Sequence, residues 1–223
     1  MKTAIIGYNG FVGSNILLNK NMTDKYNSKN INKIKGRSYD LIISTGFSGT
    51  KFIINKNPYD DILNIKNQKK LLSSVKAQRI VHISTIDVYD RKKNVDEKSK
   101  INSSKLDNYG SNRRDIENFI ISNFNKYHII RLPMLFGHNL NKNILFDLIK
   151  KKFIHNIPYY STLQWYNVQN LWKDIKIIID NNIDIINLVS EPIRTKLIID
   201  KFFNYKNEEL NLEKKIDTEI KSI

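Results

Sequence analysis

The chain has 223 residues, 40% of them hydrophobic, which is enough to bury a sizeable core and predicts one domain with a small lobe attached. It contains no cysteine, which excludes a disulfide framework, thiolate zinc sites and a cysteine nucleophile. Lysine and arginine number 37 against 22 acidic residues, a net charge of +15 that favours a phosphorylated substrate or cofactor. The lysines are spread along the whole chain, which argues against a dedicated nucleic-acid face.

The N-terminus passes from Met1 and Lys2 directly into the apolar run 3–7, without the regions of a signal peptide. No later apolar run is long enough to span a bilayer. We therefore expect a cytoplasmic protein without a membrane partner. No zinc motif and no helix-turn-helix signature is present, so neither a metal nor a nucleic acid is expected as a partner.

Short apolar runs rich in isoleucine or valine alternate with amphipathic segments. The runs predict buried strands at 3–7, 40–44, 79–84, 127–132 and 184–189. The segments between them predict helices at 10–19, 58–76 and 109–125. This alternation indicates the α/β class, a Rossmann-like doubly wound parallel sheet whose ligands bind at the carboxyl ends of the strands. We expect a dinucleotide-binding core over 1–137 and, over 138–223, a mixed segment that completes the sheet and forms a small C-terminal substrate-binding lobe.

The first predicted strand leads into GYNGFVGSN, with glycines at positions 7, 10 and 13. Glycine at such positions permits a tight turn, close approach of the backbone to a pyrophosphate and close packing of helix on strand. The N-terminus of the next helix would face the anion. The turn predicts dinucleotide binding, and the alternative is a packing turn without a ligand. The expected cofactor contacts are Gly7, Asn9, Gly10, Phe11, Val12 and Gly13.

With the spacing Gly-x-x-Gly-x-x-Gly, the chain resembles the extended and atypical, sugar-modifying branch of the short-chain dehydrogenase/reductase family. Further segments resemble motifs of that family in the order in which the family has them. They are DLIISTGFSG (its third strand and turn), DILNIKNQKKLL (its NVxGTxNLL helix), HISTIDVYD (its STxxVYG segment), NYGSNR (its YGxSK motif) and IIRLPMLFG (its xLRxxxVYG strand). Because several motifs recur in a fixed order, the resemblance implies the fold more strongly than any one motif does.

The resemblance implies further cofactor contacts at the ends of the later strands. They are Thr45, Gly46, Phe47, Asn64, Ile83, Arg113, Leu132 and Pro133. Cofactor choice depends on the end of the second strand, which we place near 25–31, because an acidic residue there selects NAD whereas serine or lysine accommodates the 2′-phosphate of NADP. Ser28 and Lys29 stand there, so we expect NADP, with NAD as the alternative.

The resemblance also implies the catalytic residues. Tyr109 matches the catalytic tyrosine, Arg113 stands in place of the partner lysine, and Thr85 matches the hydrogen-bonding serine or threonine. Asp107 or Asn108 is expected to cap the helix that carries the first two. We expect cations beside Tyr109 to lower its phenol pKa from about 10 toward 7. Because arginine keeps its charge but cannot give up a proton, a slow enzyme or a cofactor-binding protein without turnover is the alternative.

Substrate contacts are expected after the strands and in the lobe. The candidates are Ser84, Asp87, Asn139, Asn143, Gln164, Trp165 and Tyr166, each with a structural role as the alternative. The family's sugar 4,6-dehydratases place two carboxylates after the threonine. Here only Asp87 is acidic, which disfavours dehydration relative to reduction or epimerisation.

The sequence thus predicts an NAD(P)-dependent oxidoreductase of the 4-keto reductase type that acts on a nucleotide-linked sugar in surface-polysaccharide biosynthesis. One alternative is a nucleotide-sugar epimerase with a tightly bound cofactor. The alternative of another class is a catalytically silent, basic short-chain fold that binds RNA or a protein. The oligomeric state is open, although homodimers are common in the family that the chain resembles.

Overall fold

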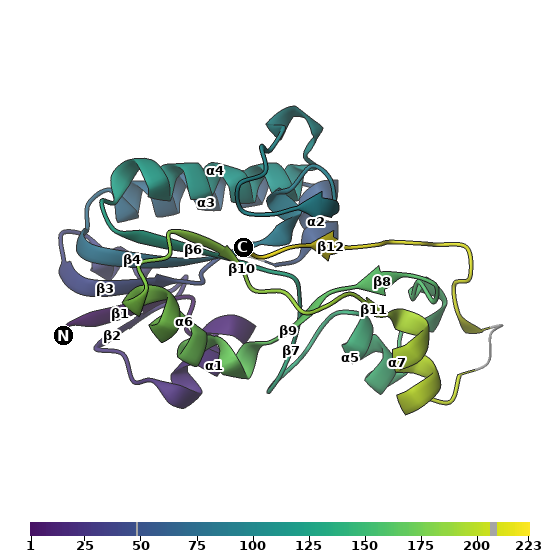
Figure 1. The fold of residues 1–223 in the computed structure, drawn as a ribbon. Coiled ribbons are helices and arrows are strands. Elements are labelled where there is room, and N and C mark those ends of the chain that lie inside the picture. Colours follow the sequence, from purple (N-terminus) through teal and green to yellow (C-terminus); the bar gives the residue numbers. More distant parts are fainter. Residues whose placement is uncertain (48, 206–208) are drawn as a thin grey trace.

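A computed structural model describes residues 1–47, 49–205 and 209–223. Its central feature is a six-stranded parallel sheet with the strand order β10-β6-β4-β3-β1-β2 (Figure 1). The strands are β1 (Thr3–Ile6), β2 (Asp24–Tyr26), β3 (Ser38–Ser44), β4 (Lys76–Thr85), β6 (Tyr127–Leu132) and β10 (Ile185–Asn187). The predicted α/β fold with a parallel sheet is confirmed.

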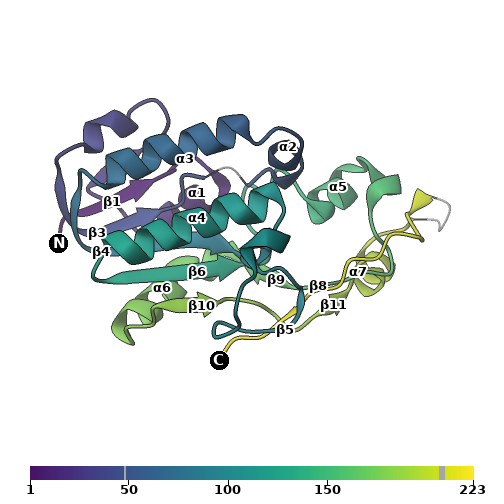
Figure 2. The ribbon, with the colours of Figure 1, turned by 90° about the horizontal axis from the view of Figure 1, so that it is seen from above.

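Helices cover both faces of the sheet. Figures 1 and 2 show α3 (Tyr59–Leu72) and α4 (Asn108–Asn123) side by side on one face, and Figure 1 shows α1 (Phe11–Asn19) and α6 (Leu171–Asp180) on the other. Neighbouring strand residues point to opposite faces and so supply two cores. The core under α3 and α4 includes Ile42, Ile80, Ile65 and Ile116. The core under α1 and α6 includes Ile43, Val81, Ile16 and Ile175.

The five predicted strands and three predicted helices are all present, with their ends shifted by a few residues. The second strand ends at Tyr26, within the range 25–31 where its end was predicted. Its bounds were not predicted, because its sequence DKY has no apolar run to mark it. The sequence did not predict α6 or three shorter helices, α2 (Lys51–Lys56), α5 (Ile144–Lys150) and α7 (Thr195–Phe202). All four have ten residues or fewer, which leaves little periodicity to detect.

A small lobe lies beyond the carboxyl ends of the strands (Figure 1). It contains α5, α7 and the two-stranded sheet of β8 (Thr162–Leu163) and β11 (Ile193–Arg194). Its own core is Leu148, Ile157, Tyr159, Ile199 and Leu210. The domain boundary at residue 137 remains a prediction. Within the described ranges, no helix combines the length and apolar character needed to cross a bilayer.

The remaining elements are short. The other strands are β5 (Lys93–Val95), β7 (Met134–Phe136), β9 (Trp165–Asn167) and β12 (Glu219–Ile220). The 3-10 helices are η1 (Ile31–Ile34), η2 (Ile86–Val88), η3 (Ser103–Lys105), η4 (Ile154–Asn156) and η5 (Val168–Asn170). After the lobe, the chain returns to the core, where β12 pairs with β5.

Gln164 fastens this returning segment. Its side-chain Nε2 donates to the carbonyl oxygens of Ser190 at 2.9 Å and Ile220 at 2.8 Å, and its Oε1 accepts from the Ile220 N–H at 2.7 Å. Both polar ends of the buried amide are therefore used by the backbone. We therefore do not include Gln164, which the sequence predicted as a substrate contact, among the residues of the candidate site.

Candidate active site

The glycine turn follows β1, and two of its glycines are required by packing. Gly7 has φ +85°, and a Cβ there would lie 2.6 Å from the Cα of Gly46. A Cβ on Gly13 would lie 2.3 Å from the carbonyl oxygen of Gly7. Gly10 differs, because a Cβ there would meet only that same oxygen, at 3.3 Å. Packing within the protein therefore explains why positions 7 and 13 are glycine but does not fully explain Gly10. Glycine is expected at such a position where a ligand approaches the backbone.

The N-terminus of α1 lies at this turn and suits an anion. Gly10 is its N-cap, with no side-chain capping bond, and no acidic residue lies in the first turn. The N–H groups and the positive end of the helix dipole thus remain available to a pyrophosphate. Asn9 is exposed beside the cap, and Phe11 and Val12 are half-buried in the first turn.

Asn15 fixes α1 from within the helix. Its Nδ2 donates to the carbonyl oxygens of Phe11 at 2.8 Å and His138 at 2.9 Å. The second bond ties the helix to the segment that follows β7. The sequence did not indicate this role of Asn15, because nothing in the local pattern distinguishes it from an exposed polar residue.

The end of β3 lies against the glycine turn. The Thr45 hydroxyl donates to the Ile6 carbonyl at 2.8 Å, so the two strand ends are joined. Gln68 donates to the Gly46 carbonyl at 3.1 Å and to Asn64 Oδ1 at 3.3 Å. Gln68 therefore links Asn64, a predicted cofactor residue, to this turn. The sequence did not indicate a role for Gln68.

Thr85 ends β4 at the same edge of the sheet. It lies opposite Leu132 at the end of β6, which Pro133 follows. Its hydroxyl oxygen accepts the Asp87 N–H at 3.1 Å and so caps η2. Two residues earlier in β4, Ile83 is half-buried in the core under α1 and α6.

Helix α4 begins against this turn. Asp107 is its N-cap and accepts the Gly110 N–H at 2.8 Å, which confirms one of the two predicted caps. A Cβ on Gly110 would lie 2.4 Å from the Asp87 carbonyl oxygen, so glycine allows the helix to approach η2 closely. This contact brings Tyr109 beside the turn that Thr85 caps.

Tyr109 and Arg113 share one face of α4. The Arg113 guanidinium carbon lies 4.8 Å from the centroid of the Tyr109 ring and 5.6 Å from that of Phe47. Tyr109 is only 8% exposed, and burial raises the pKa of its phenol more than Arg113 lowers it. The expected lowering of this pKa toward neutrality is therefore wrong for the protein without a cofactor.

Asp61 on α3 binds the Arg113 guanidinium. Arg113 Nη2 lies 2.8 Å from Asp61 Oδ1 and Nη1 lies 3.1 Å from Oδ2, and both side chains are 4% exposed. Asn112 also donates to Asp61, at 2.8 Å. A two-point bond to a buried carboxylate balances the positive charge that was expected to act on Tyr109. Contact of Arg113 with a cofactor remains a prediction.

Replacing Arg113 by lysine tests whether the guanidinium is chiefly a clamp on Asp61. We expect the free energy of unfolding, measured with urea, to fall by about 1–2 kcal/mol, because lysine cannot form the two-point bond. The exposed pair of Arg37 with Asp24 is the control, and Arg37→Lys should leave stability nearly unchanged. Unchanged stability of Arg113→Lys together with a raised KM for the dinucleotide would instead place the guanidinium on the cofactor.

Asp87 lies in a charged cluster that the sequence did not reveal. Lys51 Nζ on α2 is 2.8 Å from Asp87 Oδ1 and 3.1 Å from Asp107 Oδ2. Lys92 Nζ is 3.3 Å from Asp87 Oδ1 and donates to two backbone carbonyls of the η2 turn. The cluster holds α2 and the start of α4 on η2. The Asp87 side chain is 26% exposed and remains a candidate substrate contact.

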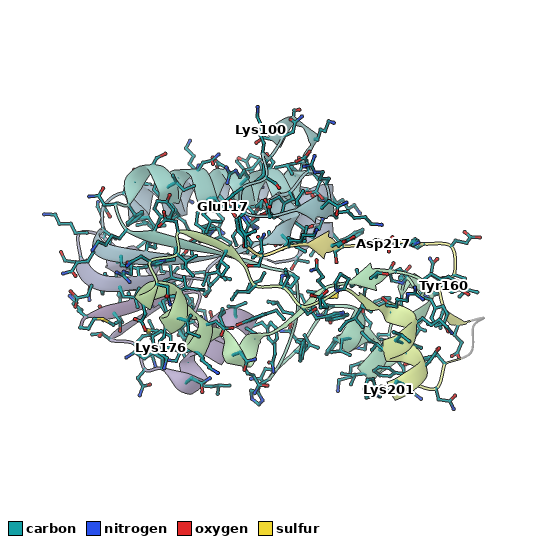
Figure 3. The ribbon with its side chains drawn as sticks, in the orientation of Figure 1. Lys100, Glu117, Tyr160, Lys176, Lys201 and Asp217 are labelled. Atoms are coloured by element: carbon teal, nitrogen blue, oxygen red, sulfur yellow. The ribbon has the colours of Figure 1, made fainter. Side chains whose placement is uncertain are left out.

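Three other predicted substrate contacts are engaged elsewhere. Ser84 donates at 2.6 Å to the buried Glu117, which Figure 3 labels between α4 and the sheet. Tyr166 donates to Asp174 on α6. Asn143 caps α5 and donates to the Leu135 carbonyl at 2.7 Å. Because the polar groups of these three side chains bind other parts of the protein, we do not include the three residues in the candidate site.

The last predicted residues divide by exposure. Asn139 is exposed, with φ +62°. Trp165 is 6% exposed, and its indole N–H has no acceptor among the described residues. Ser28 and Lys29 are exposed in the turn directly after β2, at the place where the sequence put them.

A cavity of about 1040 Å³ lies at the other edge of the sheet. It is lined by the amino ends of β3 and β4, by the end of α4 and by α6. Ligands of doubly wound sheets bind at the carboxyl ends of the strands. The residues assembled above meet that criterion, whereas the cavity lies at the opposite edge.

No protein-family model and no curated protein matches the sequence. Solved structures do match its fold. A dTDP-4-dehydrorhamnose reductase of Clostridium acetobutylicum has 20% identity and a TM-score of 0.74, with 98% of this chain and 84% of that chain covered. The Bacillus anthracis dTDP-4-dehydrorhamnose reductase in complex with NADP has 18% identity and a TM-score of 0.72 over the same shares. An NAD-dependent NDP-hexosamine 5,6-dehydratase of tunicamycin biosynthesis has 12% identity, a TM-score of 0.75 and the same coverage.

The chain therefore has the Rossmann-like fold of these reductases and this dehydratase. The fold that the motifs implied is confirmed. At identities of 20% or less these likenesses establish the fold and leave the activity to be argued from the site.

Proposed function

We propose that the protein is an NAD(P)-dependent oxidoreductase that reduces the 4-keto group of a nucleotide-linked sugar, a reaction used in surface-polysaccharide biosynthesis. One observation carries the proposal. A continuous chain of contacts joins the glycine turn to the phenol, from Gly7 against Gly46, through the adjacent Phe47 and then Arg113, to Tyr109. A cofactor on the turn and a substrate at the phenol would therefore be neighbours.

The residues of the turn fit a dinucleotide. Gly10 and the open N-terminus of α1 would hold the pyrophosphate. When bound there, a reduced nicotinamide supplies the hydride. We favour NADP, because Asn27, Ser28 and Lys29 follow β2 without a carboxylate. The nearby Asp24 carboxylate already accepts bonds from Tyr39 and Arg37.

The protonation state of Tyr109 favours reduction. Burial raises the pKa of this phenol above its usual value of about 10, so the hydroxyl keeps its proton at neutral pH. A protonated phenol can donate to the carbonyl oxygen as hydride reaches the carbon, with Thr85 bonding to the same oxygen. Oxidation of a hydroxyl, with which an epimerase begins, would need the phenolate instead.

A pH profile of kcat/KM for reduction tests this state, since that ratio reports pKa values of the free enzyme. Because the acid form is active and its pKa is raised, we expect the ratio to show no loss through neutral pH and to fall only above about pH 10. If kcat/KM instead falls near pH 7, and this fall disappears in Tyr109→Phe, the pKa of the phenol would be lowered and the proposal of a protonated phenol would be wrong.

The function itself is tested by following NADPH oxidation with dTDP- and UDP-linked 4-keto sugars. We expect turnover with at least one of them and a protein that purifies without cofactor. Purification with bound nicotinamide and interconversion of two sugar epimers would favour the epimerase. Salt-sensitive RNA binding without turnover would favour the silent fold.

A further inference from the structure

The small lobe exposes a group of large apolar side chains that the proposed reaction does not use. They are Ile149 (56% exposed), Phe153 (64%), Leu197 (59%) and Phe202 (67%). All four lie on α5 and α7 or directly after α5. These helices lie on the same side of β8 and β11 in Figure 1 and share one core through Leu148 and Ile199. Isolated exposed apolar residues are ordinary, but a group of this kind marks an interaction surface.

Lysines surround these side chains. The segments 144–156 and 195–205 contain five lysines, all exposed, and two aspartates. The lysines are Lys150, Lys151, Lys152, Lys196 and Lys201. Asp200 is already paired with Lys196 at 2.7 Å. Figure 3 places Lys201 on α7 at the outer edge of the lobe, away from the central sheet. The surface is therefore apolar and positively charged at once.

The turn after α5 is built in a way that projects both kinds of side chain. Lys151 ends the helix with φ +53°, and Phe153 has φ +49°. Glycine is the usual residue in such a left-handed position, and other residues cost about 1–2 kcal/mol there. The Lys152 N–H nevertheless closes the turn on the Asp147 carbonyl at 2.9 Å. The result is an exposed Phe153 directly after three exposed lysines.

We propose that the outer surface of the lobe, which carries these four apolar residues and five lysines, docks the protein on the surface of a membrane that contains anionic lipid. The lysines match the negative headgroups, and the phenylalanines and aliphatic side chains enter the boundary between headgroups and acyl chains. A single-stranded RNA could use the lysines and phenylalanines, but it has no comparable use for Ile149 and Leu197. The docking goes beyond the proposed reaction and does not depend on it. It departs from the expectation of no membrane partner, which rested on the lack of a spanning segment and not on the surface of the lobe.

Co-sedimentation with lipid vesicles tests the proposal on the full chain. We expect binding to vesicles that mix phosphatidylglycerol with phosphatidylcholine, loss of that binding at high salt, and none to phosphatidylcholine alone. The double variant Phe153→Ser, Phe202→Ser should lower the partition coefficient about tenfold. The triple variant Lys150→Gln, Lys151→Gln, Lys152→Gln should lower it about a hundredfold.

The matched controls change exposed residues outside the lobe. Phe52→Ser changes a phenylalanine on α2 that is 78% exposed, and Lys66→Gln changes an exposed lysine on α3. Both should bind vesicles like the original chain, and circular dichroism melting should show that all variants are folded. Failure of the original chain to bind anionic vesicles would overturn the proposal, as would equal binding by the phenylalanine variants. Loss of RNA binding or of self-association in those variants, without vesicle binding, would assign this surface to those partners instead.

Discussion

Replacing Tyr109 by phenylalanine is expected to lower kcat for reduction of a 4-keto nucleotide sugar by about 10²–10⁴-fold, the usual contribution of a positioned acid or base. The substitution removes only the hydroxyl, and the ring keeps its place against Arg113. The KM for the dinucleotide should therefore not change. Steady-state kinetics with NADPH measures both quantities.

Tyr59→Phe is the control for this experiment. Tyr59 lies on α3 and is 69% exposed, so its hydroxyl has no expected role in turnover. We expect the control to retain full kcat. Full turnover by Tyr109→Phe would remove this residue as the acid, although it would leave dinucleotide binding untouched.

Replacing Gly13 by alanine is expected to disrupt the glycine turn. The new Cβ would lie 2.3 Å from the Gly7 carbonyl oxygen and 2.9 Å from the Tyr8 Cα, both in backbone that cannot move without shifting β1 or α1. We expect the free energy of unfolding to fall by about 4 kcal/mol or more, and dinucleotide binding to be lost with the turn. Urea unfolding measures the first and calorimetry the second.

Gly36→Ala separates this clash from the effect of glycine itself. Gly36 has φ +72°, but an added Cβ there would meet nothing within 4 Å. We expect a loss of only about 1 kcal/mol, from the left-handed backbone alone. Equal losses in the two variants would contradict the close packing of helix on strand at Gly13.

The elements that the sequence revealed are those with a local signature. The strand YHIIRL is an uninterrupted apolar run, and the predicted strand 127–132 is the one observed, β6. The glycine turn and the capped start of α4 are defined by residues close together in the chain, so motif spacing was sufficient to place them. The edge strand β2 and the short helix α2 lack such a signature.

Side-chain partners distant in sequence could not be predicted. Nothing near Arg113 announces that Asp61, on another helix, binds both arms of its guanidinium. Nothing near Ser84 shows that its hydroxyl donates a hydrogen bond to Glu117 and not to a substrate. For the same reason the pKa of Tyr109 was predicted in the wrong direction, because it depends on burial by the assembled fold.

The central claim is that a dinucleotide lies against the glycine turn, and Gly10 tests it most directly. A Cβ on Gly10 would meet only the Gly7 carbonyl oxygen, at 3.3 Å, a tight contact that a shift of a few tenths of an ångström relieves. Gly10→Ala should therefore fold, with a much smaller loss of melting temperature than Gly13→Ala. Calorimetric titration with NADPH should show binding to the original chain and binding to Gly10→Ala that is weaker by about tenfold or more, equivalent to at least about 1.4 kcal/mol. Equal affinities in the two proteins, or no binding of NADPH or NADH to the original chain, would contradict the account.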